Sequence, residues 1–336
     1  MSYYRIIDRR KKTLSDLPTM LVTFTVCFLC LGLACYHSVG FPLAVVDAVF
    51  PVYGILCRLL NNCFAVYAIG LLLTILVAYI IQRINDIENL IRERTRLVFM
   101  LFILFTSTNM GLLPFKEISI VLLCLVFMLY ELIGAYQMPE ATGRLFNAGV
   151  LVGFAGLFMP QTLWYVPLLW LGMYQFRSLN LRSFLASLAG VMIIYWFLLA
   201  WCVWKHDFYL FASFYSSFVD FDFFTVFLLV RYEWIGSIGI VLLLFISFFY
   251  IKMDAFSNRV RVRLMLSFLF NMSVWSLLLV CFYGGDADSF LALLYLPVSV
   301  LIAYFLENIR HRFQFLLYYF MLVLCASSFI LRLWNF

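Results

Sequence analysis

One acid and four basic residues of this chain have the types and positions needed for chemistry on a phosphate-bearing substrate at a membrane surface. Asp47 is the single acid of the segment His37–Asn62, where a carboxylate can act as a general base. Cationic side chains on the same predicted side bind phosphate or pyrophosphate. These candidates are Arg58, Lys205, His206 and Arg231. The alternative is that all five are ordinary polar residues of the membrane interface.

Glu131 is a second kind of candidate, because it is the one carboxylate inside a long apolar run, Ile118–Tyr136. A charge buried in lipid is costly, so an intramembrane acid is by default a candidate for a proton or ion relay. Glu131 lies between one and two turns from the predicted inner end of its helix. A helix-pairing role, or a side chain that reaches out to water, is therefore the alternative.

Other familiar chemistries have no matching motif. The three histidines, His37, His206 and His311, lack the spacing of a zinc site, and no phosphate-binding glycine loop or G-x-S-x-G string occurs. Gly284–Asp288 holds two acids but too few oxygen ligands for a hard cation, so we expect a turn there. The sequence predicts no metal site and no cofactor.

The composition shows which elements must position these residues. Hydrophobic residues make up 66% of the 336 residues and charged residues only 12%, and the mean hydropathy is +1.03. Soluble domains are about half apolar and about a quarter charged. A soluble enzyme, a disordered chain and a nucleic-acid-binding domain are therefore excluded, and the expected partner of most of the surface is a lipid bilayer.

Eleven apolar runs predict an all-α bundle of about 11 transmembrane helices, since a span needs about 20 mostly apolar residues. The fifth and sixth runs are short and are separated by Pro160, so 145–176 is either two spans or a re-entrant hairpin. The runs are Met20–Tyr36, Cys63–Ile81, Leu97–Leu113, Ile118–Tyr136, Leu145–Met159, Leu163–Phe176, Phe184–Trp204, Trp234–Ile251, Leu264–Tyr283, Ser289–Leu306 and Phe315–Leu331.

The basic residues predict the orientation of a single integral membrane domain, residues 1–336. With the basic N-terminal segment 1–19 in the cytoplasm, eighteen of the 23 Lys and Arg residues fall on the inner side. The C-terminus then lies outside. The remaining five are Arg58, Lys116, Lys205, Arg231 and Arg332.

Three segments between the runs carry further predictions. On the inner side, Gln82–Arg96 is expected to extend the second span as a helix, with i,i+4 pairs such as Glu88/Arg92. On the outer side, His37–Asn62 and Lys205–Glu233 are long. Phe208–Val219 has only 12 residues between two acids, and its interleaved aromatic and serine residues predict a helix that lies flat at the outer interface.

Two resemblances add to this interpretation. The glycine-rich stretch Leu145–Phe158, followed by Pro160, Trp164, Pro167 and Trp170, and the earlier Ile84-Asn85-Asp86, resemble a family of polytopic bacterial inner-membrane proteins of uncharacterised activity. About half of the chain is covered. The order of a basic N-terminus, a first span and an acid in the first outer loop is also similar to membrane glycosyltransferases that use polyprenyl-phosphate sugars. That likeness implies Asp47 as the catalytic acid.

Three functional hypotheses remain open. The first is an inner-membrane protein of the bacterial cell envelope without a catalytic constellation, accessory to envelope assembly or export. The second is a glycosyltransferase or polymerase that acts on a polyprenyl-phosphate-linked sugar with Asp47 as base. The third is a transporter that uses Glu131. The expected partners are the bilayer and a lipid-linked substrate or other envelope membrane proteins, and nucleic acid is not among them.

Overall fold

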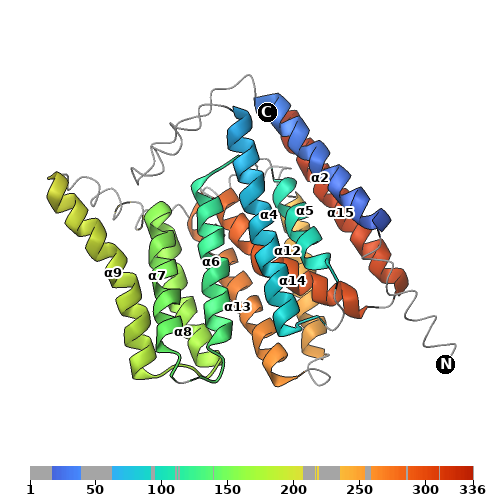
Figure 1. Cartoon of the computed structure of the whole chain (residues 1–336). Coiled ribbons are helices and arrows are strands. Elements are labelled where there is room, and N and C mark those ends of the chain that lie inside the picture. Colours follow the sequence, from blue (N-terminus) through green and yellow to red (C-terminus); the bar gives the residue numbers. More distant parts are fainter. Residues whose placement is uncertain are drawn as a thin grey trace.

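The computed structural model describes residues 17–38, 63–91, 95–109, 112, 114–138, 140–206, 216, 218, 235–253, 259–284, 287–309 and 311–335. These residues form eleven α-helices and one short 3-10 helix, η2, without a strand, which confirms the all-α prediction (Figure 1). The helices are α2 (Leu17–Ser38), α4 (Cys63–Glu88), α5 (Leu97–Ser107), α6 (Glu117–Gly134), α7 (Thr142–Phe158), η2 (Pro160–Trp164), α8 (Tyr165–Gln175), α9 (Leu181–Lys205), α12 (Ile235–Met253), α13 (Val260–Phe282), α14 (Ala287–Asn308) and α15 (His311–Asn335).

Each of the eleven predicted runs coincides with one of these helices. Among the described residues, seven helices are long and apolar enough to cross a membrane by themselves. The second helix continues to Glu88, so the predicted inner extension Gln82–Arg96 is helical in its first half, whereas residues 89–91, 95 and 96 are not helical. Helix α5 ends at Ser107, before the expected Leu113. The α5 helix ends early at its C-cap residue Thr108, and Gly111 and Pro114 in the chain that follows disfavour a helix.

The short helix α5 nevertheless belongs to a segment that runs the whole height of the bundle. It starts at the lower end in Figure 1 and points upward between α4 and α14. The chain after it reaches the upper end, where the Phe115 backbone N–H donates to the Val66 carbonyl oxygen (3.2 Å) in the first turn of α4. The prediction that this run joins opposite ends of the bundle is therefore consistent with the structure.

The hairpin of α7, η2 and α8 also joins both ends. At the top, the Trp164 indole N–H of η2 donates to the Tyr283 hydroxyl (2.9 Å) at the end of α13. At the bottom, the Gln137 N–H after α6 donates to the Phe176 carbonyl after α8 (3.1 Å). Of the two alternatives left open for 145–176, the structure thus favours two traversing segments over a re-entrant loop.

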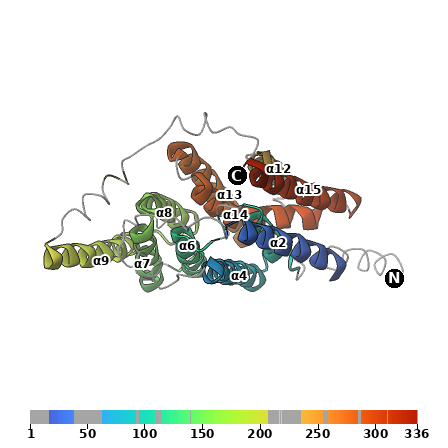
Figure 2. The ribbon, with the colours of Figure 1, turned by 90° about the horizontal axis from the view of Figure 1, so that it is seen from above.

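Helix α14 is the centre of the bundle. It packs against α5, α6, α12, α13 and α15, and 94% of its apolar stretch is buried. Figure 2 shows the bundle as elongated when viewed from above, with α9 at one extreme and α2, α12 and α15 at the other. Since only 22% of the apolar stretch of α9 is buried, α9 contributes most of its side chains to the lipid-facing surface.

The α7–α9 contact is made by small residues. Gly149 lies against the backbone of Ser187, and Gly190 lies against the backbone of Phe146 and Val150, so that an added Cβ atom at either glycine would overlap the other helix. Close approach of this kind is a common basis of helix association in lipid, where side-chain burial gains little. The glycine-rich stretch of α7 is thus a helix-packing surface.

Most of the described basic residues lie near the helix ends that are at the bottom of Figure 1, as the orientation prediction requires. There the Arg261 guanidinium of α13 pairs with the Glu88 carboxylate of α4 (2.7 Å) and lies over the Tyr136 ring (5.3 Å). Glu88 therefore pairs across helices, and its predicted partner Arg92 lies outside the described residues. The helix ends at Glu88, and Asn89 has a positive φ of 48°. The described basic residues toward this end are Arg83, Arg96, Arg144, Arg177, Arg182, Lys252, Arg259, Arg261, Arg263 and Arg312, against Lys116, Lys205 and Arg332 toward the upper end.

Candidate functional site

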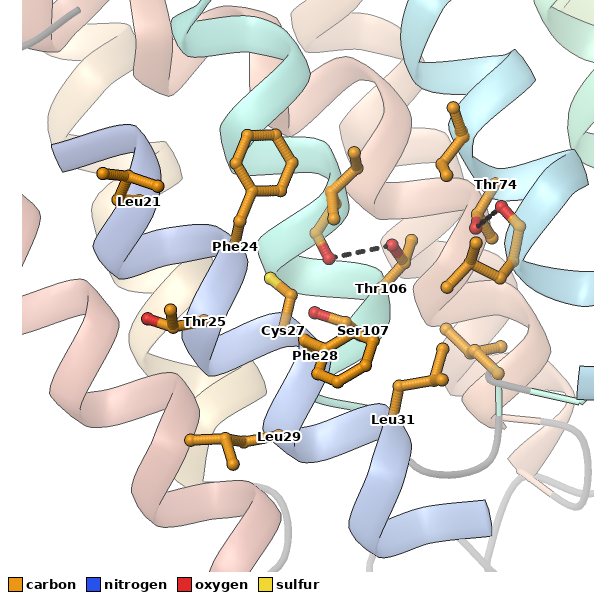
Figure 3. Close-up of a pocket in the computed structure, with 14 residues that line it drawn as sticks. Leu21, Phe24, Thr25, Cys27, Phe28, Leu29, Leu31, Thr74, Thr106 and Ser107 are labelled. Carbon is orange, nitrogen blue, oxygen red and sulfur yellow. Dashed lines mark hydrogen bonds between the residues drawn. The ribbon is translucent and has the colours of Figure 1, made fainter. Parts of the chain in front are cut away.

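The described residues of α2, α4 and α5 enclose a cavity of about 620 Å³ that could hold a ligand. Figure 3 shows its lining side chains, with α2 in front, α5 behind and α4 to one side. We call this cavity the lateral groove. Its lining from α2 is Leu21, Phe24, Thr25, Cys27, Phe28, Leu29 and Leu31, and its remaining lining is Leu71, Thr74, Ile75, Ile103, Thr106, Ser107 and Leu112.

The lateral groove exists because α2 and α4 touch at one end only. Near the top of the bundle, Cys30 and Ala34 of α2 form a small buried cluster with Tyr67 of α4 and Phe329 of α15. Further down, α2 and α4 diverge and α5 lies behind the gap (Figure 1). There α2 leans on α5, where the Phe24 and Phe99 rings lie 6.3 Å apart between centroids.

The hydroxyl groups in the groove are bonded to their own helices. Thr25 donates to the Val22 carbonyl and Thr74 to the Leu71 carbonyl, each at 2.8 Å. Thr106 donates to the Phe102 carbonyl (2.9 Å), and Ser107 donates to the Leu104 carbonyl (3.3 Å). Since these protons are already used, and since no charged residue occurs in the described lining, the groove matches an uncharged hydrocarbon chain.

The two walls of the groove differ in exposure. On α2, Leu21, Phe28 and Leu29 are 57%, 75% and 62% exposed, so the mouth opens toward the surrounding solvent, which is lipid for this class of protein. On α5, Thr106 and Ser107 are buried at the base of the groove. An occupant that enters from the bilayer would therefore meet α2 first and reach α5 last.

The predicted catalytic and phosphate-binding residues lie elsewhere or outside the described residues. Asp47, Arg58 and Arg231 are outside the described residues. Lys205 and His206 end α9, at the opposite extreme of the bundle from α2; the Lys205 ammonium lies 5.6 Å from the centre of the Trp201 ring, and His206 has a left-handed backbone (φ 52°). Their shared role in phosphate binding stays a prediction.

Glu131 occupies the last turn of α6, at the lower end of the bundle, and is half-buried. This is the predicted position near the helix end. Glu131 does not line the lateral groove. It also does not line either of two smaller cavities, one with Ile81 and Val300 in its lining and the other with Thr108 and Ser328. The relay role of Glu131 stays a prediction.

The predicted interfacial helix Phe208–Val219 lies almost entirely outside the described residues. Of its residues the structure describes Ser216 and Phe218, both in helical conformation. The Phe218 ring stacks on the Trp164 ring (5.3 Å between centroids), and the Tyr283 hydroxyl donates to the Phe218 carbonyl (2.7 Å). Phe218 is therefore held against the upper end of α13 and η2.

Sequence reasoning did not find the lateral groove. The one available signal was the run Thr106-Ser107-Thr108-Asn109, an unusual group of polar residues at the end of an apolar stretch. Thr25 and Thr74 are single hydroxyls in apolar helices, and such residues commonly bond their own backbone. Their convergence on one cavity depends on how three helices pack.

The fold and the groove define an integral membrane protein of the polytopic all-α class. Comparison of the chain with protein-family models, with curated proteins and with solved structures finds no match.

Proposed function

We propose that this chain is a bacterial inner-membrane protein that serves cell-envelope assembly or export by holding the hydrocarbon chain of a lipid or lipid-linked molecule in the lateral groove. The observation that carries the proposal is the cavity of about 620 Å³ with an uncharged lining and self-bonded hydroxyls. Ligand cavities in proteins commonly measure about 300–1,000 Å³ and are mostly apolar. In the proposed orientation the N-terminus is cytoplasmic and the C-terminus is outside.

Selectivity in such a groove has a particular physical source. Bulk lipid chains are as apolar as the lining, so the hydrophobic effect favours neither the bound nor the free chain. Binding must come from shape, that is, from the extra dispersion contacts of a chain enclosed by three helices. The test must therefore measure saturable binding in competition with bulk lipid.

The experiment uses the full chain in nanodiscs with a trace of lipid that carries a photoreactive group in its chain, followed by mass spectrometry. We expect labels on the inner wall, at Ile103, Thr106 and Ser107, that disappear when unlabelled lipid of the same type is added in excess. Two probes are used, a diacyl phospholipid and a polyprenyl phosphate. They distinguish whether the bound hydrocarbon chain belongs to a bulk lipid or to a lipid-linked molecule.

A matched pair of variants on α4 controls for nonspecific labelling. Thr74 lines the groove, whereas Leu72 is 61% exposed and lies outside the lining. Thr74→Phe should fill the groove and remove the inner-wall labels, and Leu72→Phe should leave them unchanged. Inner-wall labelling that does not saturate, or that survives Thr74→Phe, contradicts the proposal.

A second candidate function is a glycosyltransferase that uses a polyprenyl-phosphate sugar with Asp47 as base. The supporting observation is that the groove extends along α2 to Leu31, and α2 leads at Ser38 directly into the segment that carries Asp47. On this hypothesis Asp47→Asn removes sugar transfer but keeps saturable labelling in the groove. Transfer retained in Asp47→Asn would exclude Asp47 as the base.

A further inference from the structure

A second, smaller cavity lies between α5, α12, α14 and α15, and its lining is mostly polar. It holds about 10 Å³, which is room for one water molecule or one ion of similar size. Thr108 and Asn109 reach it from the end of α5, Ser237 from α12, Tyr295 from α14 and Ser328 from α15. All five side chains are buried.

Two hydroxyl oxygens of this cavity, those of Thr108 and Ser328, offer lone pairs rather than protons. Thr108 donates its proton to the Leu104 carbonyl (2.9 Å) and Ser328 donates to the Cys325 carbonyl (2.8 Å), so their remaining lone pairs are available to the cavity. The Ser237 and Tyr295 hydroxyl oxygens lie 3.4 Å apart, and one of them donates its proton to the other. Thr108 and Ser328 therefore suit an occupant that is positive or a hydrogen-bond donor.

A carboxylate contacts one of the residues that line the cavity. The Asn109 amide N–H donates to Asp288 Oδ1 (3.4 Å) in the first turn of α14. The partial negative charge at the end of α5 and the partial positive charge at the start of α12 both lie near the cavity, so these two helix-dipole charges offset each other. Asp288 thus places a carboxylate close to the described lining of the cavity, which favours a cation.

We propose that this polar cavity binds one Na⁺ ion through the hydroxyl oxygens of Thr108, Ser237, Tyr295 and Ser328 and the side-chain oxygen of Asn109. A monovalent ion suits uncharged oxygen ligands, whereas Mg²⁺ and Ca²⁺ require carboxylates or several waters. The site is separate from the lateral groove, since α5 alone contributes to both and by different residues. It adds an ion-binding property that the proposed function does not include.

Gly236 makes this arrangement sterically feasible. A Cβ atom at residue 236 would stand 2.5 Å from the Ser328 hydroxyl oxygen, so only glycine lets that oxygen and α12 approach each other. Gly239, one turn further, instead meets the flexible end of Leu324. The lack of a side chain at Gly236 therefore lets α12 approach α15 at the point where the Ser328 oxygen lines the cavity.

The experiment compares two neighbouring serines of α15 in the purified full-length protein. Ser328 lines the cavity and Ser327 does not, yet each donates to the carbonyl three residues earlier at 2.8 Å. Binding of ²²Na⁺ and the midpoint of thermal unfolding are measured in NaCl, KCl and choline chloride at equal ionic strength. We expect saturable binding and a rise in the midpoint with Na⁺ in the native protein and in Ser327→Ala.

Ser328→Ala should weaken Na⁺ affinity by about tenfold or more, the equivalent of one lost ligand to a charged group. Tyr295→Phe removes a second oxygen while keeping the ring, and should do the same if Ser328→Ala does not fold. Equal midpoints in the three salts with no bound ²²Na⁺ would overturn the proposal and leave a water site. Na⁺ binding unaffected by both substitutions would place the ion elsewhere and overturn it as well.

Discussion

Substitution of Gly149 should separate α7 from α9. An alanine Cβ at this position would stand 2.9 Å from the Ser187 carbonyl carbon and 3.0 Å from its Cα, and would overlap the Ser187 oxygen. Ordinary contacts of this kind begin at 3.4 Å, so the helices must move apart by at least about half an ångström, and backbone atoms cannot rotate away. Overpacking of this kind costs about 1–3 kcal/mol.

The same helix contains two graded controls. A Cβ at Gly143 meets nothing within 4 Å, and a Cβ at Gly153 stands 3.2 Å from Val191. Gly143→Ala should be neutral or stabilising by up to about 1 kcal/mol, from helix propensity alone. Gly153→Ala should fall between Gly143→Ala and Gly149→Ala. The order of stability therefore follows the order of backbone clearance.

The assay is equilibrium unfolding in bicelles, with the thermal midpoint as a second readout. A cost of 1–3 kcal/mol corresponds to a shift of about 1.5–4 °C for a chain of this size. Gly190→Ala overlaps the Phe146 carbonyl of the same crossing, so the Gly149→Ala/Gly190→Ala double variant should cost less than the sum of the singles, because one separation relieves both. Equal stability of Gly149→Ala and Gly143→Ala would refute the close backbone approach.

Three further outcomes are expected. Reporter fusions after Arg92 and Arg261 should be cytoplasmic and a fusion after Asp220 should be outside; an outside signal at Arg261 would invert the topology from the seventh helix onward. Glu88→Arg and Arg261→Glu should each lower the free energy of unfolding by about 1 kcal/mol or less, and the double exchange should restore it, since the pair is partly exposed; no recovery in the double variant would count against the pair. Glu131→Gln should leave saturable lipid labelling unchanged, and a loss of ion- or proton-coupled transport in that variant would support the transporter hypothesis instead.

The sequence alone was sufficient for the helices, whereas several of their ends differ from the predicted runs: α9 begins at Leu181 and not at Phe184, and α15 ends at Asn335 and not at Leu331. Each apolar run became a helix because backbone groups in lipid have no water to bond and must be satisfied within the helix. Signals for helix ends were local as well: Asn180 and Ser183 cap the start of α9 reciprocally, and Pro160 begins η2 after α7 ends. The end position of Glu131 in α6 followed from the same counting.

The packing of the helices depended on the tertiary structure. In lipid, residues that face the bilayer and residues that face the core are both apolar, so hydropathy does not mark which helix is central. Helix α14 is nearly all buried and α9 is mostly exposed, although their mean hydropathies, 2.2 and 2.1, are almost equal. Only shape and close approach, such as Gly149 against Ser187, decide which faces meet.

Both candidate sites are also products of this packing. Thr25, Thr74 and Ser107 come from three helices, and Ser237 and Ser328 come from two others, with long stretches of chain between them. In the sequence each is one hydroxyl in an apolar run, the usual pattern of a residue that bonds its own backbone. A groove arises where α2 and α4 diverge, and a polar cavity arises where α5 ends against α12 and α15. The sequence determined the helices, whereas the angles and contacts between them determined where a ligand has room.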